Sequence, residues 1–145
     1  TATDSVFANT WTHLTCVFDN PNDTLAVYIN GVLASTPGEG DIADLSDGSN
    51  VFYIGRETGT ARQFEGYISD VAYYSTPLSD ADVQTLFNDG NPYDHKQGNN
   101  NGYLEGWWRC GDGIESGKGS TVFDMSGTGN DGTIENGVVF SKEQR

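Results

Sequence analysis

The chain has 145 residues, of which 35% are hydrophobic, 19% are charged and 12% are aromatic, and 19 of them are glycines. This length is enough for a domain with its own core, and the composition is typical of a β-rich fold with many turns, which excludes a disordered chain. The formal net charge of −14 makes nucleic acid and anionic membranes unsuitable partners, because both require clustered Lys and Arg.

The first predicted strand covers residues 11–18. Leu14, Cys16 and Phe18 alternate along it, so we expect all three on one inward side. Cys110 also lies in an apolar stretch, and neither cysteine belongs to a CxxC pair. Two interpretations stay open for the cysteines, namely buried free thiols or a disulfide between them.

A β-hairpin is predicted around Asn30-Gly31, because this dipeptide suits the two-residue type I′ turn. Its arms are the alternating runs 25–29 and 32–34. After a polar loop, further strands are predicted over residues 51–55 and 63–75.

A helix is predicted to begin after Ser79, which is a plausible N-cap with Asp82 three residues later. Val83, Leu86 and Phe87 form its apolar stripe. We expect Gly90 to end it.

The rest of the chain indicates further strands and one connection. Residues 91–102 are a polar, low-complexity stretch that we interpret as a linker or loop. Strands are predicted over residues 103–110, 120–123 and 133–140. Many short strands with Gly-rich turns and one short helix predict an all-β fold, an antiparallel jelly-roll sandwich.

Several segments together resemble the second half of laminin-G-like domains, which belong to the concanavalin A-like lectin/glucanase superfamily. These segments are Trp11-Thr12-His13-Leu14, Leu25-Ala26-Val27-Tyr28-Ile29-Asn30-Gly31, Tyr53-Ile54-Gly55, Phe64-Glu65-Gly66-Tyr67-Ile68-Ser69-Asp70-Val71-Ala72-Tyr73-Tyr74 and Leu78-Ser79-Asp80-Ala81-Asp82-Val83. The resemblance implies a concanavalin A-like sandwich with residues 1–92 as the C-terminal half of the domain.

The last part of the chain is similar to the opening of such a domain. Gly106-Trp107-Trp108-Arg109 and the turn 124–133 are similar to the family's first strand and the turn after it. Residues 93–102 would then be a linker, and residues 103–145 would pack into the same sandwich. Because the late part of the domain comes first, we expect a truncated or permuted form.

The resemblance also bears on location and assembly. The tail with tandem tryptophans is similar to structural proteins of marine bacterial viruses, which implies a virion surface or another extracellular location. The chain begins with Thr, so we expect a processed product or part of a longer protein. An incomplete sandwich exposes strand edges, and we therefore expect a homo-oligomer or a larger assembly.

Residues 124–133 combine two Asp, one Asn, one Ser and three Gly, which can bring hard oxygen ligands together and suit Ca²⁺. The resemblance implies that Asp124, Ser126, Asn130 and Asp131 hold the ion together with the distant Asp70. The acidic net charge favours a cation partner, although it could equally be a solubilising surface. The alternative is that these residues are simply turn formers.

Aromatic side chains are the candidates for stacking on sugar rings, although most aromatics in strands are core residues. The wider set is Tyr53, Tyr73, Tyr74, Tyr93, Tyr103, Trp107 and Trp108. Tyr93 and Tyr103 lie beside polar loops. One of Trp107 and Trp108 must face outward from its strand, and Trp107 is our candidate.

The sequence indicates no catalytic site. Retaining glycosidases place two carboxylates across the scissile bond, and the Glu-x-Asp-x-x-Glu pattern of the superfamily's glucanases is absent. We therefore expect a non-catalytic recognition or adhesion module that binds glycans or surface proteins with calcium support. The alternatives are a purely structural virion protein and a carbohydrate-binding module of a secreted enzyme.

Overall fold

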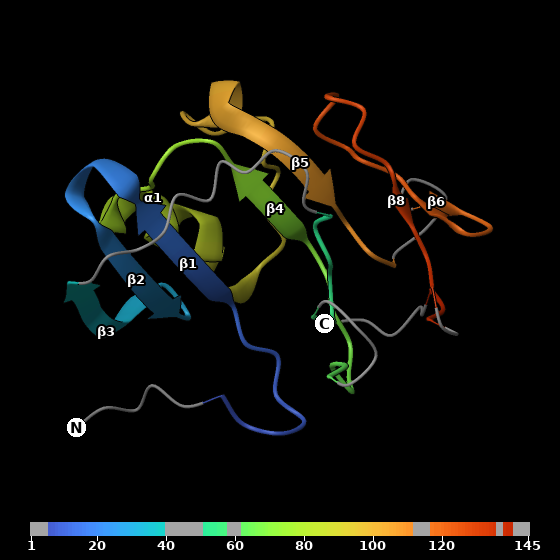
Figure 1. Cartoon of the computed structure of the whole chain (residues 1–145), viewed down its shortest axis with the longest axis horizontal. Helices are drawn as coiled ribbons and strands as arrows, with labels where there is room; N and C mark the ends of the chain where they lie inside the picture. Colours follow the sequence, from blue (N-terminus) through green and yellow to red (C-terminus); the bar gives the residue numbers. More distant parts are fainter. Residues whose placement is uncertain (1–5, 40–50, 58–61, 112–116, 136–137, 141–145) are drawn as a thin grey trace. The chain divides into compact units, whose positions relative to one another are not determined.

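The computed structural model describes residues 6–39, 51–57, 62–111, 117–135 and 138–140 (Figure 1). These residues form short strands, one α-helix and three short 3-10 helices. The strands are β1 (Leu14–Asp19), β2 (Thr24–Ile29), β3 (Val32–Glu39), β4 (Val71–Tyr74), β5 (Leu104–Trp108), β6 (Gly117–Lys118), β7 (Thr121–Val122) and β8 (Gly132–Thr133). The helices are α1 (Asp80–Phe87) and the 3-10 turns η1 (Asn20–Asn22), η2 (Asn88–Gly90) and η3 (Asn101–Tyr103).

The strands pair antiparallel in three small sheets, ordered β1-β2-β3, β4-β5 and β6-β7-β8. This mostly β architecture with a single α-helix among the described residues confirms the predicted fold class. The chain forms two compact units. The first comprises residues 1–46 and 76–94, and the second comprises residues 47–75 and 95–144. The predicted division at residues 92 and 102 stays a prediction.

The hairpin of the first unit forms as predicted. Ile29 pairs with Val32 across the turn, and Asn30 and Gly31 both have positive φ, 50° and 76°. Those two angles define the type I′ geometry, which glycine and asparagine adopt at low cost.

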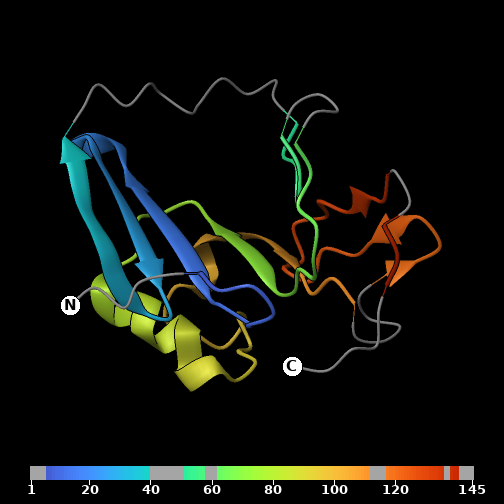
Figure 2. The same ribbon diagram turned by 90° about the horizontal axis from the view of Figure 1, so that it is seen from below.

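Helix α1 lies against one face of the β1-β2-β3 sheet (Figure 2). The predicted capping box is present, since the Ser79 side chain accepts a hydrogen bond from the Asp82 N–H and the Asp82 carboxylate accepts from the Ser79 N–H. The helix ends at Phe87, earlier than Gly90 would place it, because Asn88 adopts the left-handed conformation (φ 47°) and closes the helix.

The core of the first unit consists of Ala26, Tyr28 and Val83, with Val17 packed against them. Val17 pairs with Ala26 across the sheet, so both point towards the helix. In addition, the Tyr28 hydroxyl donates to Asp80 Oδ1 at 2.5 Å in a partly buried hydrogen bond. The sheet is therefore attached to the helix by both apolar packing and a partly buried hydrogen bond.

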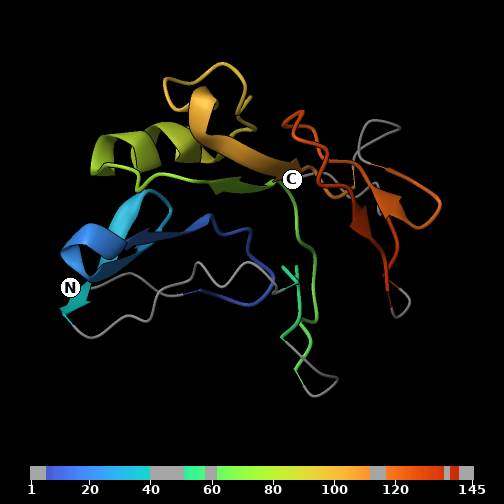
Figure 3. The same cartoon turned by 45° about the horizontal axis from the view of Figure 1, so that its top comes forward.

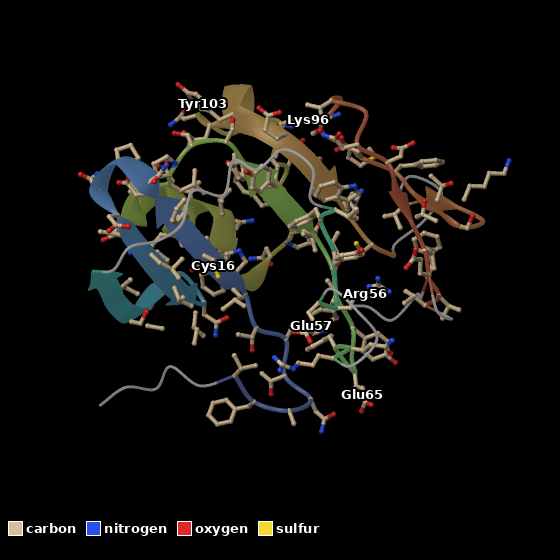
Figure 4. The ribbon with its side chains drawn as sticks, viewed as in Figure 1. Cys16, Arg56, Glu57, Glu65, Lys96 and Tyr103 are labelled. Atoms are coloured by element: carbon tan, nitrogen blue, oxygen red, sulfur yellow. The ribbon has the colours of Figure 1, made fainter. Side chains whose placement is uncertain are left out.

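The prediction that the side of β1 with Leu14, Cys16 and Phe18 faces inward was wrong. Leu14 is 58% exposed and Cys16 is exposed, because the opposite side of the strand, which carries Val17, packs on the helix (Figure 4). Alternation identified the two sides of the strand, but it could not tell which of them the helix would cover.

Both cysteines are free, so the interpretation that they form a disulfide was wrong as well. Cys110 is half-buried, and burial raises the pKa of its thiol to about 11.

Val83 is the fully buried side chain of this core, with 0% exposure, and its apolar burial stabilises the unit. We expect Val83→Ala to lower the free energy of unfolding by about 2 kcal/mol, through lost burial and the cavity that remains. Val32→Ala, at a position 59% exposed, is the matched control and should change stability by less than about 0.5 kcal/mol. Urea denaturation measures both, and equal effects would contradict this placement of the core.

Three predicted strands of the second unit are shorter than expected or absent. No strand forms at residues 51–55, where Gly55 has φ 79° and only an isolated bridge between Arg56 and Gln63 follows. The strand expected over 63–75 is reduced to β4, because Asp70 (φ 50°) interrupts the extended backbone directly before it. Of the strand expected over 133–140, only Thr133 lies in a strand, as the second residue of β8, among the residues that the structure describes; residues 136–137 lie outside them.

Candidate functional site: an aromatic cluster on strands β4 and β5

Strands β4 and β5 lie side by side in the second unit (Figure 3). Val71 pairs with Trp108 and Tyr73 with Gly106, so these residues share one face of the two-stranded sheet. Gly106 has no side chain, and the indole of Trp108 occupies the space above it, since a β-carbon there would overlap the ring. Glycine at this position therefore lets the indole lie flat on its own strand.

Phe52 and Tyr73 complete an aromatic cluster with Trp108. The Phe52 ring stacks on the Trp108 indole, with 5.7 Å between centroids and 28° between planes. The Phe52 and Tyr73 rings are 6.2 Å apart and inclined at 45°. Trp108 is buried at 8% exposure, whereas Phe52 and Tyr73 are 60% and 53% exposed. We use the name aromatic cluster for these three residues.

The base of the aromatic cluster is fixed by a hydrogen bond. The indole Nε1 of Trp108 donates to the backbone carbonyl of Asn130 at 2.8 Å. This donor is consequently used within the protein, and the indole is held in one orientation beneath Phe52. The Phe52 ring thus stacks on an indole that is held in place, and Tyr73 lies beside Phe52. Less side-chain motion then has to be lost when a ligand binds.

Trp107 lies on the other face of β5, and the expectation that it is open to a sugar was wrong. Its side chain is 7% exposed, its Nε1 donates to Asp70 Oδ1 at 3.2 Å, and its ring meets His95 edge-on at 5.2 Å. His95 is itself buried, and its Nδ1 lies 2.7 Å from the Tyr74 hydroxyl. Alternation correctly placed the two tryptophans on opposite faces, but both faces of β5 are covered.

The other two stacking candidates lie in different units. Tyr103, at the end of η3, is 51% exposed in the second unit (Figure 4). Tyr93 is half-buried in the first unit. The predicted set of Tyr93, Tyr103 and Trp107 therefore does not form one site within either unit.

The predicted calcium ligands form a tightly hydrogen-bonded turn around Asp124. Its Oδ1 accepts from the N–H groups of Trp107 and Ser126, each at 2.9 Å, and its Oδ2 accepts from the N–H of Asn130 at 2.9 Å. The Thr128 hydroxyl also lies 2.8 Å from Oδ2. This carboxylate therefore closes the turn and attaches it to β5.

The ionised form of Asp124 is strongly favoured. Burial alone would raise its pKa, but hydrogen bonds from the Ser126 side chain and from the backbone N–H groups of Trp107, Ser126 and Asn130 hold the pKa well below the ordinary 3.8. Those N–H groups direct their positive ends at both carboxylate oxygens. A cation at the same oxygens would have to replace these hydrogen bonds.

The remaining predicted ligands have separate contacts. Asp131 Oδ1 accepts from the Asp124 N–H at 2.8 Å, and Asp70 Oδ1 accepts from Trp107. The Asn130 amide donates to the carbonyl of Glu105 at 2.8 Å. Within the described ranges, no three His, Cys, Asp or Glu side chains come together in a way that could hold a metal ion. Calcium binding by Asp70, Asp124, Ser126, Asn130 and Asp131 stays a prediction.

Sequence reasoning missed Phe52 because it lies in an irregular segment. Residues 51–55 were expected to form a strand, and nothing in that pattern distinguishes Phe52 from its neighbours as a binding residue. Its stacking partner Trp108 is also distant in sequence. The available signal was Gly106 two residues before Trp108 on one face of a strand, which leaves room for a large ring to lie over the backbone.

Comparison with known proteins agrees with this fold. The laminin-G family model described as the concanavalin A-like lectin/glucanases superfamily matches residues 1–84. The chain therefore belongs to this superfamily, which confirms that part of the resemblance. The likeness to marine viral proteins stays a prediction. A comparison with curated proteins found no match.

Two solved structures share the fold. A "putative carbohydrate binding protein" from Bacteroides ovatus aligns with 98% of this chain and 41% of its own, at 20% identity and TM-score 0.68. An S-layer domain-containing protein from Clostridium thermocellum aligns with 57% of this chain and 42% of its own, at 22% identity and TM-score 0.51. The chain thus spans about two fifths of the length of either relative.

None of the helices in the described ranges is long and apolar enough to cross a bilayer.

Proposed function

We propose that the chain is a non-catalytic glycan-recognition module in which a saccharide stacks on Phe52 and Tyr73. The observation that carries this proposal is the aromatic cluster, where the exposed Phe52 ring stacks on a buried, hydrogen-bonded tryptophan and the exposed Tyr73 ring lies beside Phe52. Large exposed aromatic surface usually serves recognition, because exposing it has a cost in water. The superfamily and the name of the Bacteroides relative support a carbohydrate as the ligand.

The chemistry of the aromatic cluster suits a sugar ring. The C–H groups on one side of a pyranose are apolar and slightly positive, and they pack against the negative face of an aromatic ring. Such contacts are individually weak, and we expect about 1.5 kcal/mol from each ring. Strong attachment would then come from several copies presented together.

The proposal includes an extracellular location, on a cell or a virion surface. The family membership and the S-layer name of the Clostridium relative support a surface role. The module could also belong to a secreted carbohydrate enzyme, because the solved relatives are more than twice as long as the aligned part.

A structural role in assembly is the second candidate. It is favoured by the side of the β1-β2-β3 sheet that faces away from α1, where Leu14 is 58% and Leu25 42% exposed. Light scattering over a concentration series tests it. A stable oligomer together with no glycan binding would favour assembly over recognition.

The decisive comparison for glycan binding is between two phenylalanines of equal exposure. Phe52 and Phe64 are both 60% exposed and belong to the same unit, but only Phe52 is in the aromatic cluster. We expect Phe52→Ala to weaken binding to a polysaccharide about tenfold in affinity electrophoresis, and Phe64→Ala to leave it within about twofold. Equal losses, or no loss from Phe52→Ala, would contradict the site.

Calcium support is tested by the same measurement with calcium or with EDTA. Because Asp124 is already hydrogen-bonded at both oxygens, we expect binding to be unchanged by chelation. Loss of binding in EDTA, restored by calcium, would instead support the predicted ligand set.

A further inference from the structure

We infer that the ligand of the aromatic cluster is an uncharged polysaccharide chain, bound across at least two consecutive sugar rings. This inference rests on the proposed function and defines its ligand class. It follows from two observations, the absence of charge in the cluster and the inclination of its two exposed rings.

The groups that form the aromatic cluster are all uncharged. Phe52, Tyr73 and Trp108 carry no formal charge, and the hydrogen-bond partner of Trp108 is the backbone carbonyl of Asn130. Recognition of a carboxylated or sulfated sugar ordinarily uses a bidentate arginine. No charged side chain is among the described contacts of the three rings.

The two arginines nearest to Phe52 in sequence are engaged with acidic partners. The Arg56 guanidinium lies 3.1 Å from Glu135 and stacks over the Tyr53 ring at 4.3 Å (Figure 4). Arg62 lies 3.3 Å from Glu57. An acidic sugar would have to replace these glutamates.

The charge of the whole chain opposes an acidic ligand as well. It has 21 acidic and 7 basic residues, which repel an anionic polymer over roughly 10 Å at 0.1 M salt. A neutral polymer meets no such barrier, and desolvating it costs less than desolvating a carboxylate.

The geometry of the exposed rings indicates more than one sugar. Phe52 and Tyr73 are inclined at 45° to each other, so one pyranose cannot lie flat on both. Their centroids are 6.2 Å apart, a separation comparable to that of neighbouring rings in a polysaccharide. Consecutive sugars rotate about their glycosidic bond, and each can then match one aromatic plane.

The test begins with a panel of neutral polysaccharides, namely mixed-linkage β-glucan, xyloglucan, galactomannan and α-glucan, in affinity electrophoresis. The polymer that binds is then oxidised at C6, which introduces carboxylates and keeps the backbone. We expect the oxidised polymer to bind at least about tenfold more weakly at low salt, and the deficit to shrink as salt rises. Polygalacturonate should not bind.

A length series tests the second part of the inference. Calorimetry with the mono-, di- and tetrasaccharide of the same polymer should show affinity rising at least about tenfold from one ring to two. Tyr73→Ala should remove that gain and leave the weak monosaccharide affinity within about twofold. Tyr67→Ala, another exposed tyrosine of the same unit, is the matched control.

The outcomes separate the inference from the proposal beneath it. Equal or stronger binding of the oxidised polymer, or full affinity with the monosaccharide, would overturn the inference and leave glycan recognition standing. Binding to none of the neutral or acidic polymers would overturn the proposed function itself.

Discussion

Replacing Asp124 with Asn is expected to lower the free energy of unfolding by about 2 kcal/mol at pH 7. The carboxylate accepts three backbone N–H groups, and an asparagine offers one acceptor oxygen in place of two. Its amide group would also point hydrogens at a backbone donor. Because the turn is partly open to water, we expect less than the sum of three charge-assisted hydrogen bonds.

The same residue predicts how stability depends on pH. The folded-state pKa of Asp124 lies below its ordinary value of 3.8, so the unfolded chain binds the proton more readily. Its contribution is therefore complete above about pH 5 and is lost as the pH falls from there towards the depressed folded pKa. Denaturation of wild type and Asp124→Asn at a series of pH values should show the difference between them narrowing in acid.

Asp131 provides the control for this experiment. Its Oδ1 accepts the Asp124 N–H, and Asp131→Asn keeps a carbonyl oxygen at that position. We expect a loss of less than about 0.5 kcal/mol. A loss as large as that of Asp124→Asn, present with calcium and abolished by EDTA, would show that the two carboxylates act as metal ligands.

Gly106→Ala is expected to have the second large effect, with about 2 kcal/mol of destabilisation and loss of glycan binding. A β-carbon at residue 106 overlaps the six-membered ring of the Trp108 indole, which cannot move without disturbing Phe52 and its own hydrogen bond to Asn130. The displaced indole no longer supports the stacked ring. Thermal unfolding and affinity electrophoresis measure the two consequences.

Gly102 makes this prediction specific to the aromatic cluster. It belongs to the same unit, and a β-carbon there would meet no atom within 4 Å. Gly102→Ala should therefore change stability by less than about 0.5 kcal/mol and keep full binding. Full binding by Gly106→Ala would show that the position of Trp108 is unimportant for the ligand.

Local chemistry explains which elements could be predicted from the sequence. The turn at Asn30-Gly31 and the capping box of Ser79 and Asp82 formed as expected, because the residues that determine them are neighbours in the chain. The orientation of β1 could not be predicted in this way. It depends on whether the helix covers Val17 or Leu14, and both sides of that strand are partly apolar.

The candidate site was only partly predictable for a related reason. Tyr73 and Trp108 were among the aromatic candidates, but exposure depends on what covers each face of β5. Trp107 is covered by His95, which lies in a stretch interpreted as a polar linker, whereas Trp108 is covered by Phe52. Contacts between residues so far apart leave no periodic pattern in the sequence, so the stacking of Phe52 on Trp108 was found only in the structure.

The most direct test of glycan recognition by the aromatic cluster is to map the bound ligand on the protein. We would titrate the tetrasaccharide of the binding polymer into isotopically labelled protein and follow the aromatic and backbone resonances. The largest shifts are predicted at Phe52 and Tyr73, with smaller shifts at the supporting Trp108. Shifts centred on Tyr93 or on the Asp124 turn, with the cluster unchanged, would contradict the account.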